Sequence, residues 1–159
     1  MIDGSKILAV FCFITFKNQY LLMERYFPPY KGFYVPVGGK MKAHETPDAA
    51  LQREVMEEIG ILVDRPKFCG VLIESSPTSY NYCSFLYSIE LPEFQTVTSD
   101  EGAMHWVEND DVLSMKIPPI DHYVYPYIFD GKPFVLDAVY DGKMALQSVH
   151  CKLSSQKFL

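Results

Sequence analysis

The chain has 159 residues, which is about the length of one domain and enough to bury a sizeable core. Apolar residues make up 48% of it, including eleven Phe and eleven Tyr, and this share excludes a disordered chain. The net charge of −6 excludes a broad basic surface for a nucleic-acid backbone.

The first elements in chain order are predicted strands. Ile7–Phe16 is an apolar run, Tyr20–Arg25 follows it, and the three residues between them are typical of a hairpin turn. A short strand near Phe33–Val35 leads into the segment P-V-G-G, residues 36–39. Its two glycines are expected to let the backbone come close to a ligand.

A helix is predicted from Pro47 to Ile59. Thr46 suits its N-cap, and Pro47 suits its first turn because a missing N–H costs nothing there. Gly60 supplies the stop that is expected just past the end of a helix.

Three carboxylates share one face of this helix, because Glu54, Glu57 and Glu58 stand at i, i+3 and i+4. Like charges at this spacing destabilise an isolated helix by roughly 0.2–0.5 kcal/mol per pair, so something must offset the repulsion. A hard divalent cation would do so, since Mg²⁺ is held by a few carboxylate oxygens, waters and substrate phosphates. The alternative is a solvated acidic face with one Arg53–Glu57 pair. The Gly-Gly turn, Glu45 and the arginine directly before Glu54 favour the metal site.

Later strands are predicted at Lys67–Glu74, Tyr82–Glu90 and Ala103–Val107, and a hairpin at Phe134–Tyr140 and Lys143–His150. The Asp-Gly pair at 141–142 is typical of a tight turn between the last two strands. Helices are predicted at 110–113 and 121–129, and the proline at 126 is expected to kink or shorten the second. Residues 1–153 would form one domain, and residues 154–159 are expected to fray.

The four cysteines, at positions 12, 69, 83 and 151, lack the spacing of a zinc or redox motif and are interpreted as reduced thiols. The apolar run at 7–16 is too short to cross a bilayer and is not followed by a signal-peptide cleavage site. We therefore expect a cytoplasmic protein with no membrane partner.

The segment from Gly39 to Ile61 reads G-K-M-K-A-H-E and, after seven further residues, R-E-V-M-E-E-I-G-I. It resembles the Nudix box, G-x5-E-x7-R-E-U-x-E-E-x-G-U with U a bulky aliphatic residue, at every defined position. The resemblance is to MutT-like Nudix hydrolases. It implies an α+β fold, the Nudix α/β/α sandwich with a mixed central sheet, and hydrolysis of a nucleoside diphosphate linked to another group.

The resemblance also implies roles for individual residues. The metal ligands would be Glu57 and Glu58 as the main pair, then Glu54 and the carbonyl of Gly38. Glu54 is also the first candidate for the base that activates water, and Arg53 would serve catalysis by orienting the glutamates. Structural support would come from Gly39, Glu45 and Gly60. Mg²⁺ is the expected cofactor, with Mn²⁺ as a substitute.

Outside the box, Glu101 lies five residues before Trp106, where MutT-like enzymes contribute a fifth carboxylate to the metal. A solvated loop residue is an equal alternative for it, and Asp100 is the nearby competitor. Arg25 and Lys40 are the local cations that could meet a phosphate.

The C-terminal half is similar to the diphosphatases that remove oxidised purine nucleotides such as 8-oxo-dGTP. In that group an Asp near the start of the last helix binds the base, and Asp121 falls at the matching place. The alternative for Asp121 is a helix N-cap. Val35 and Pro118 depart from the pattern, because they stand where an Asn and a Trp often contact the base.

Three functions follow from these resemblances. The first is cleavage of a nucleoside triphosphate to nucleoside monophosphate and pyrophosphate, and the second is an ADP-ribose or nucleotide-sugar pyrophosphatase. The third is a non-catalytic nucleotide-binding module, which the intact carboxylates disfavour. The expected partner is a small nucleotide and not a nucleic-acid polymer, and a homodimer is compatible with the sequence.

Overall fold

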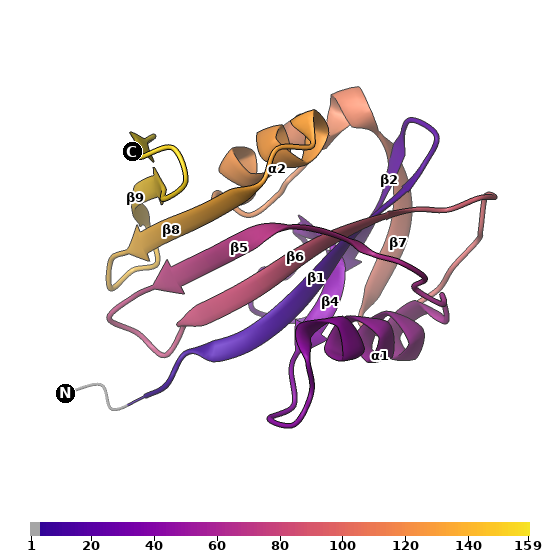
Figure 1. Ribbon diagram of the computed structural model, residues 1–159, viewed down its shortest axis with the longest axis horizontal. Coiled ribbons are helices and arrows are strands. Elements are labelled where there is room, and N and C mark those ends of the chain that lie inside the picture. Colours follow the sequence, from indigo (N-terminus) through magenta and orange to yellow (C-terminus); the bar gives the residue numbers. More distant parts are fainter. Residues whose placement is uncertain (1–3) are drawn as a thin grey trace.

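The computed structural model describes residues 4–159 and is a mixed sheet between two helices (Figure 1). Helix α1 (Pro47–Ile59) covers one face and α2 (Asp121–Asp130) the other, so the predicted α/β/α sandwich is confirmed. A short 3₁₀ helix, η1 (Asn109–Ser114), lies where the sequence predicts a helix at 110–113. In these described residues no helix has the length and apolar character needed to cross a membrane.

Ten strands make up the sheet in residues 4–159. They are β1 (Ile7–Phe16), β2 (Gln19–Arg25), β3 (Tyr34–Val35), β4 (Val37–Lys40), β5 (Lys67–Ser75), β6 (Tyr82–Glu90), β7 (Gly102–Glu108), β8 (Phe134–Tyr140), β9 (Leu146–Cys151) and β10 (Gln156–Lys157).

The strand order is β10-β9-β8-β5-β6-β1-β2-β3, with β7 on β2 and β4 on β1. The pairs β1–β6 and β5–β8 are parallel and the other pairs are antiparallel, so the sheet is mixed as expected. One edge of β1 is shared, because β4 pairs with its first half and β2 with its last residues. The strand that carries the glycines is thereby placed directly beside the centre of the sheet.

Strand β1 crosses the middle of the sheet, and its two faces pack against different helices. Val10 and Cys12 belong to the apolar cluster that contains Leu51 of α1. Phe13 belongs to the cluster on the other face, where its ring lies 5.2 Å from the ring of Tyr125 of α2. A strand covered on both faces has no solvent side, which explains the continuous apolar run at 7–16.

Helix α1 has the bounds that the sequence predicts. The hydroxyl of Thr46 accepts the N–H of Ala49 at 3.2 Å and caps the first turn. Gly60 ends the helix in the left-handed region at φ 71°, and its N–H donates to the carbonyl of Met56. Both ends are therefore set by residues that lie next to the helix in sequence.

Four local predictions are wrong. The segment with Gly38 and Gly39 is a strand rather than the predicted turn, because it pairs with β1. The last hairpin has a loop at 141–145 instead of a two-residue turn, since the Asp141 carboxylate accepts the N–H groups of Lys143 and Ala145. Pro126 does not shorten α2, which continues to residue 130. Within the tail that is expected to fray, β10 pairs with β9.

Replacing Gly38 by Ala should destabilise the fold. The new Cβ would lie 2.0 Å from the carbonyl oxygen of Val10 and 2.8 Å from the Cα of Phe11, and these backbone atoms cannot rotate away. We expect the free energy of unfolding to fall by about 1–3 kcal/mol or more, as in overpacked cores, measured by urea denaturation. Gly142→Ala is the matched control, because only one side-chain carbon lies near its added Cβ, at 4.0 Å. Equal stability of the two variants would contradict the tight β1–β4 contact.

Candidate active site

A cavity of about 520 Å³ opens between β4, the β2–β3 loop and the start of α2. Its volume is in the range of small-molecule sites. The predicted site residues that line it are Arg25, Gly38, Gly39, Lys40, Glu54, Glu101 and Asp121. The fold therefore brings residues from five separate stretches of the sequence to one hollow.

Arg53 holds the acidic face of α1 together. Its Nη1 donates to Oε1 of Glu54 at 2.7 Å and to Oε2 of Glu57 at 3.2 Å. Its Nε and Nη2 donate to the carboxylate of Glu45, and Nη2 also reaches the carbonyl oxygen of Lys40 at 3.1 Å. One guanidinium thus joins the helix to the loop that precedes it, which suits the orienting role predicted for Arg53.

Glu45 is the partner of Arg53 on the loop side. Its carboxylate also accepts the backbone N–H of Lys42 at 2.8 Å. The hydrogen bond from Arg53, followed by the one from Lys42, lowers the pKa of Glu45 to about 2. The position suits a supporting role, because Glu45 does not line the cavity and ties the loop to the helix.

Glu58 faces β4 and a loop carboxylate. The N–H of Gly38 donates to Oε2 of Glu58 at 3.1 Å, and the carboxylate of Glu101 lies within hydrogen-bonding range of the same side chain. Burial first and the contact with Glu101 second raise the pKa of Glu58 to about 8, with a smaller contribution from Glu54. The fold therefore carries Glu101, which precedes β7, to the box helix.

Gly39 leaves room for the carboxylate of Glu54. A Cβ on Gly39 would lie 2.3 Å from Oε2 of Glu54 and 2.5 Å from its Cδ. The sequence predicts that the two glycines let the backbone come close to a ligand. In the structure they come close to atoms of this chain instead, namely the carboxylate of Glu54 and the backbone of β1.

The box carboxylates do not all point to one place. The side chain of Glu57 is 61% exposed, and neither Glu57 nor Glu58 lines the cavity. Across residues 4–159 no three His, Cys, Asp or Glu side chains converge in the geometry of a metal site. Arg53 donates to carboxylate oxygens of Glu54 and Glu57, and the N–H of Gly38 donates to one of Glu58. These are oxygens that the predicted ligands would need to turn toward a metal ion.

The chemistry of the donors nevertheless suits a hard divalent cation. Glu54 and Glu101 line the cavity, and Glu58 is in contact with Glu101. Carboxylate oxygens are the ligands that Mg²⁺ prefers. Burial first, and then the neighbouring carboxylates of Glu101 and Glu54, raise the pKa of Glu58, and a bound cation would lower it.

Asp121 is not the N-cap of α2. Ile120 holds that position, with no side-chain cap, and the carboxylate of Asp121 has no hydrogen bond within residues 4–159. Asp121 instead lines the cavity, and burial followed by the charge of Glu74 raises its pKa to about 8. The N-cap alternative is therefore wrong.

Glu74 is a cavity residue that the sequence prediction missed. It lies in β5, is 4% exposed, and accepts the hydroxyl of Tyr140 at 2.6 Å. Its inward position continues the alternation of Leu72. A carboxylate at an apolar position of a predicted strand was the available signal, because a buried acid is rare unless it is paired or functional.

The two predicted phosphate-binding cations, Arg25 and Lys40, differ in their hydrogen bonds and in their exposure to solvent. Arg25 donates from Nε to the carbonyl oxygens of Phe27 and Pro29, the second at 2.8 Å, and so shapes the loop over the cavity. Lys40 lines the cavity with an exposed side chain at the end of β4. Lys40 is therefore the more exposed positive charge beside the carboxylates.

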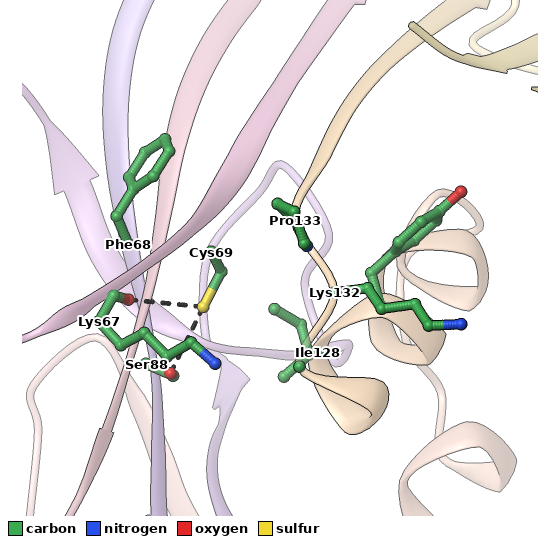
Figure 2. Close-up of a pocket in the computed structure, with 9 residues that line it drawn as sticks. Lys67, Phe68, Cys69, Ser88, Ile128, Lys132 and Pro133 are labelled. Atoms are coloured by element: carbon green, nitrogen blue, oxygen red, sulfur yellow. Dashed lines mark hydrogen bonds between the residues drawn. The ribbon is translucent and has the colours of Figure 1, made fainter. Parts of the chain in front are cut away.

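A second hollow of about 70 Å³ lies between β5 and the end of α2 (Figure 2). Figure 2 shows the thiol of Cys69 at its edge, 3.5 Å from the carbonyl oxygen of Lys67 and 3.4 Å from the hydroxyl of Ser88. This volume is far below that of a nucleotide site, and none of the predicted site residues lines it.

The metal-free protein should lose stability as the pH rises from about 5 to about 8. Glu58 and Asp121 have pKa values of about 8 in the folded protein, whereas unperturbed carboxyl groups titrate at roughly 4. Between these values the folded protein keeps protons that the unfolded chain has released, so the free energy of unfolding falls with rising pH. Urea denaturation in EDTA across this range measures the slope.

Glu58→Gln removes one of these groups and should flatten the slope, while the exposed Glu93→Gln should keep it. A wild-type stability that stays constant or rises over this range would contradict the raised pKa values. The sign reverses in acid, because the lowered pKa of Glu45 contributes stability that is lost as the pH falls from about 4.5 toward about 2.

The NUDIX domain family model matches residues 5–128. The Nudix hydrolase YvcI of Bacillus subtilis is 25% identical to this chain over 126 residues, which are 76% of this chain and 78% of YvcI. The sequence relationship thus extends well beyond the box at 39–61.

Solved structures share the fold. A mutator MutT protein from Bacillus halodurans superposes with a TM-score of 0.81 at 23% identity, over 92% of this chain and 98% of that one. The NUDIX domain of Shewanella oneidensis NrtR, in complex with ADP ribose, gives a TM-score of 0.69 at 14% identity, over 80% of this chain and 88% of that one. Because the family model matches most of the residues and the sandwich, box helix and relatives agree with it, this chain belongs to the Nudix hydrolases and is a pyrophosphohydrolase acting on nucleoside diphosphate-linked substrates.

Proposed function

We propose that this enzyme cleaves a nucleoside triphosphate, with oxidised purine nucleotides such as 8-oxo-dGTP as the leading substrate class, to nucleoside monophosphate and pyrophosphate. The observation that carries the proposal is the single cavity that joins Glu54 and Glu101 at one end to Asp121 at the other. A nucleotide that fills it places its phosphates among the carboxylates and its base beside Asp121.

Mg²⁺, or Mn²⁺ as a substitute, would be held by Glu54, Glu57, Glu58, Glu101 and the carbonyl of Gly38. When bound, the metal supplies neutralisation of phosphate charge and a lowered pKa for a coordinated water. Reaching this arrangement requires Glu57 to turn from Arg53 toward the cavity. Its exposed side chain and the long 3.2 Å contact with Arg53 leave that turn open.

The remaining roles fall on residues of the chain itself. Glu54 is the proposed base that takes a proton from the attacking water, because it lines the cavity beside β4. Arg53 fixes the carboxylate of Glu54 through the 2.7 Å hydrogen bond and does not line the cavity. Lys40 and Arg25 are the proposed cations for the phosphates that the carboxylates would otherwise repel.

The second candidate is an ADP-ribose pyrophosphatase. It is favoured by the fold shared with the NrtR domain, whose structure contains ADP ribose. A panel of nucleoside triphosphates, oxidised triphosphates, ADP-ribose and nucleotide sugars separates the two, with phosphate release read after a coupling pyrophosphatase. Turnover of triphosphates alone supports the proposal, and turnover of ADP-ribose alone contradicts it. A chain that binds these ligands without turnover would be a non-catalytic module.

Glu57→Gln should lower kcat by more than about a hundredfold on the best substrate of the panel, because even indirect partners of a bound metal contribute 10- to 100-fold. The fold should persist, since Glu57 is an exposed helix residue. Glu93→Gln, which removes an exposed carboxylate far from the box in sequence, is the control and should keep wild-type turnover. Near wild-type turnover of Glu57→Gln would show that Glu57 is not a ligand.

Added Mg²⁺ should raise the melting temperature of the wild-type enzyme, because a ligand that binds only the folded state stabilises it by mass action. In EDTA, Glu58→Gln should melt at or above the wild-type temperature, since the substitution relieves repulsion with Glu101 and Glu54. Millimolar Mg²⁺ should raise the melting temperature of Glu58→Gln much less than it raises that of the wild-type enzyme. Equal shifts in the two proteins would mean that Glu58 does not hold the metal.

A further inference from the structure

Residues 26–33 connect β2 to β3, and we call this segment the roof loop. It lines the cavity through Pro28, Pro29 and Tyr30. The ring of Tyr30 lies 6.3 Å from the ring of Tyr80, which comes shortly before β6. Because β1 lies between β2 and β6 in the sheet, the loop must cross over β1 to make this contact. The roof loop therefore covers the cavity and does not merely border it.

The roof loop can form few hydrogen bonds of its own. Two of its residues, Pro28 and Pro29, are prolines and lack a backbone N–H. Within residues 4–159 no backbone N–H donates to the carbonyl of Phe27 or of Pro29. The side chains of Tyr26 and Phe27 are exposed, so their burial adds little stability to the loop. A loop of this kind opens easily unless a side chain outside it holds its shape.

Arg25, the last residue of β2, is that side chain. Its Nε donates to the carbonyl oxygen of Phe27 at 3.3 Å and to that of Pro29 at 2.8 Å. Its backbone N–H donates to the carbonyl of Phe33 at 3.0 Å, and its own carbonyl accepts the N–H of Gly32 at 2.8 Å. One residue thus closes the two ends of the roof loop on each other and also bonds the carbonyls inside it.

Tyr30 has a backbone conformation that a bulky residue rarely adopts. Its φ of 63° lies in the left-handed region. Such a conformation persists only where the surrounding contacts hold it, and residues of this kind are concentrated at functional sites. The contacts here are the hydrogen bond from Arg25 to the preceding residue and the edge-on packing of the Tyr30 ring against Phe33 at 5.3 Å and Tyr80 at 6.3 Å. The placement of Tyr30 over the cavity therefore depends on Arg25.

We propose that Arg25 is a positioning residue, which braces the roof loop so that Tyr30 covers a bound nucleotide. The inference rests on the proposed function, because it takes a nucleotide as the occupant of the cavity. The brace needs more than positive charge, since both carbonyls accept the N–H at the position of Nε. A lysine would keep the charge for the phosphates but has a methylene group at that position, so Arg25→Lys separates the two roles.

Cleavage of the metal-free protein by chymotrypsin after Tyr26 measures how often the roof loop opens. Arg25→Lys should be cleaved there about tenfold faster or more than wild type, the range of a lost hydrogen bond to a charged group. Lys31→Gln, which changes an exposed cation of the same loop, is the matched control and should be cleaved at the wild-type rate. Equal cleavage of Arg25→Lys and wild type would overturn the brace.

On the best substrate of the panel, Arg25→Lys should raise KM about tenfold with a smaller change in kcat, and the inhibition constant of pyrophosphate should stay within about twofold of wild type. Tyr30→Asn removes the ring but suits the left-handed conformation, and it should raise KM by a similar factor. The double variant should show no further rise, because Arg25 acts through Tyr30. An inhibition constant raised as much as KM, or effects that multiply in the double variant, would contradict the proposal.

Melting curves show that each variant is folded before its kinetics are compared, and Tyr30→Asn tests the roof loop independently of Arg25→Lys. Cleavage by chymotrypsin needs no substrate, so it separates this inference from the proposed function. Turnover of triphosphates with unchanged cleavage of Arg25→Lys rejects the brace alone. Faster cleavage of Arg25→Lys in a protein that does not turn over triphosphates rejects the proposed hydrolysis alone.

Discussion

The guanidinium of Arg53 is the contact on which the arrangement of the box depends. It donates to Glu45, Glu54 and Glu57 and to the carbonyl of Lys40, and so connects the loop, the helix and the end of β4. Without it, the adjacent carboxylates of α1 would repel one another and turn into solvent. The same contact engages oxygens of Glu54 and Glu57, and within residues 4–159 no three acidic, His or Cys side chains converge on a common metal position.

Carboxyl groups with raised pKa values lie at both ends of the cavity. Glu58 lies beside Glu101 near β4, and at the start of α2 burial and the charge of Glu74 act on Asp121. Burying acids near one another opposes folding, so such pairs are expected where a ligand supplies what the protein lacks. A bound cation would relieve the first pair. The cavity is therefore lined by carboxyl groups both at the box helix and at the start of α2.

The mixed sheet keeps these two ends apart and in one hollow. Strand β1 is covered on both faces, and its shared edge lets β4 lie beside it while β6 and β5 follow on the other side. The glycines of β4 allow this packing, since a side chain on Gly38 would collide with the backbone of β1. The strand order thus places β4 on one side of β1 and β6, followed by β5, on the other.

The sequence by itself determined the elements whose signals are local. Helix α1 has its predicted bounds because Thr46, Pro47 and Gly60 act on the turns next to them, and the fixed spacing of the box places the glutamates on one face. Only the tertiary structure decided which distant residues meet. Glu101 reaches Glu58 through the pairing of β7 with β2, and Glu74 and Asp121 line one cavity because β5 and α2 contribute to the same apolar cluster. The strands β4 and β10 likewise depend on partners far away in sequence, and no local pattern encodes such pairing.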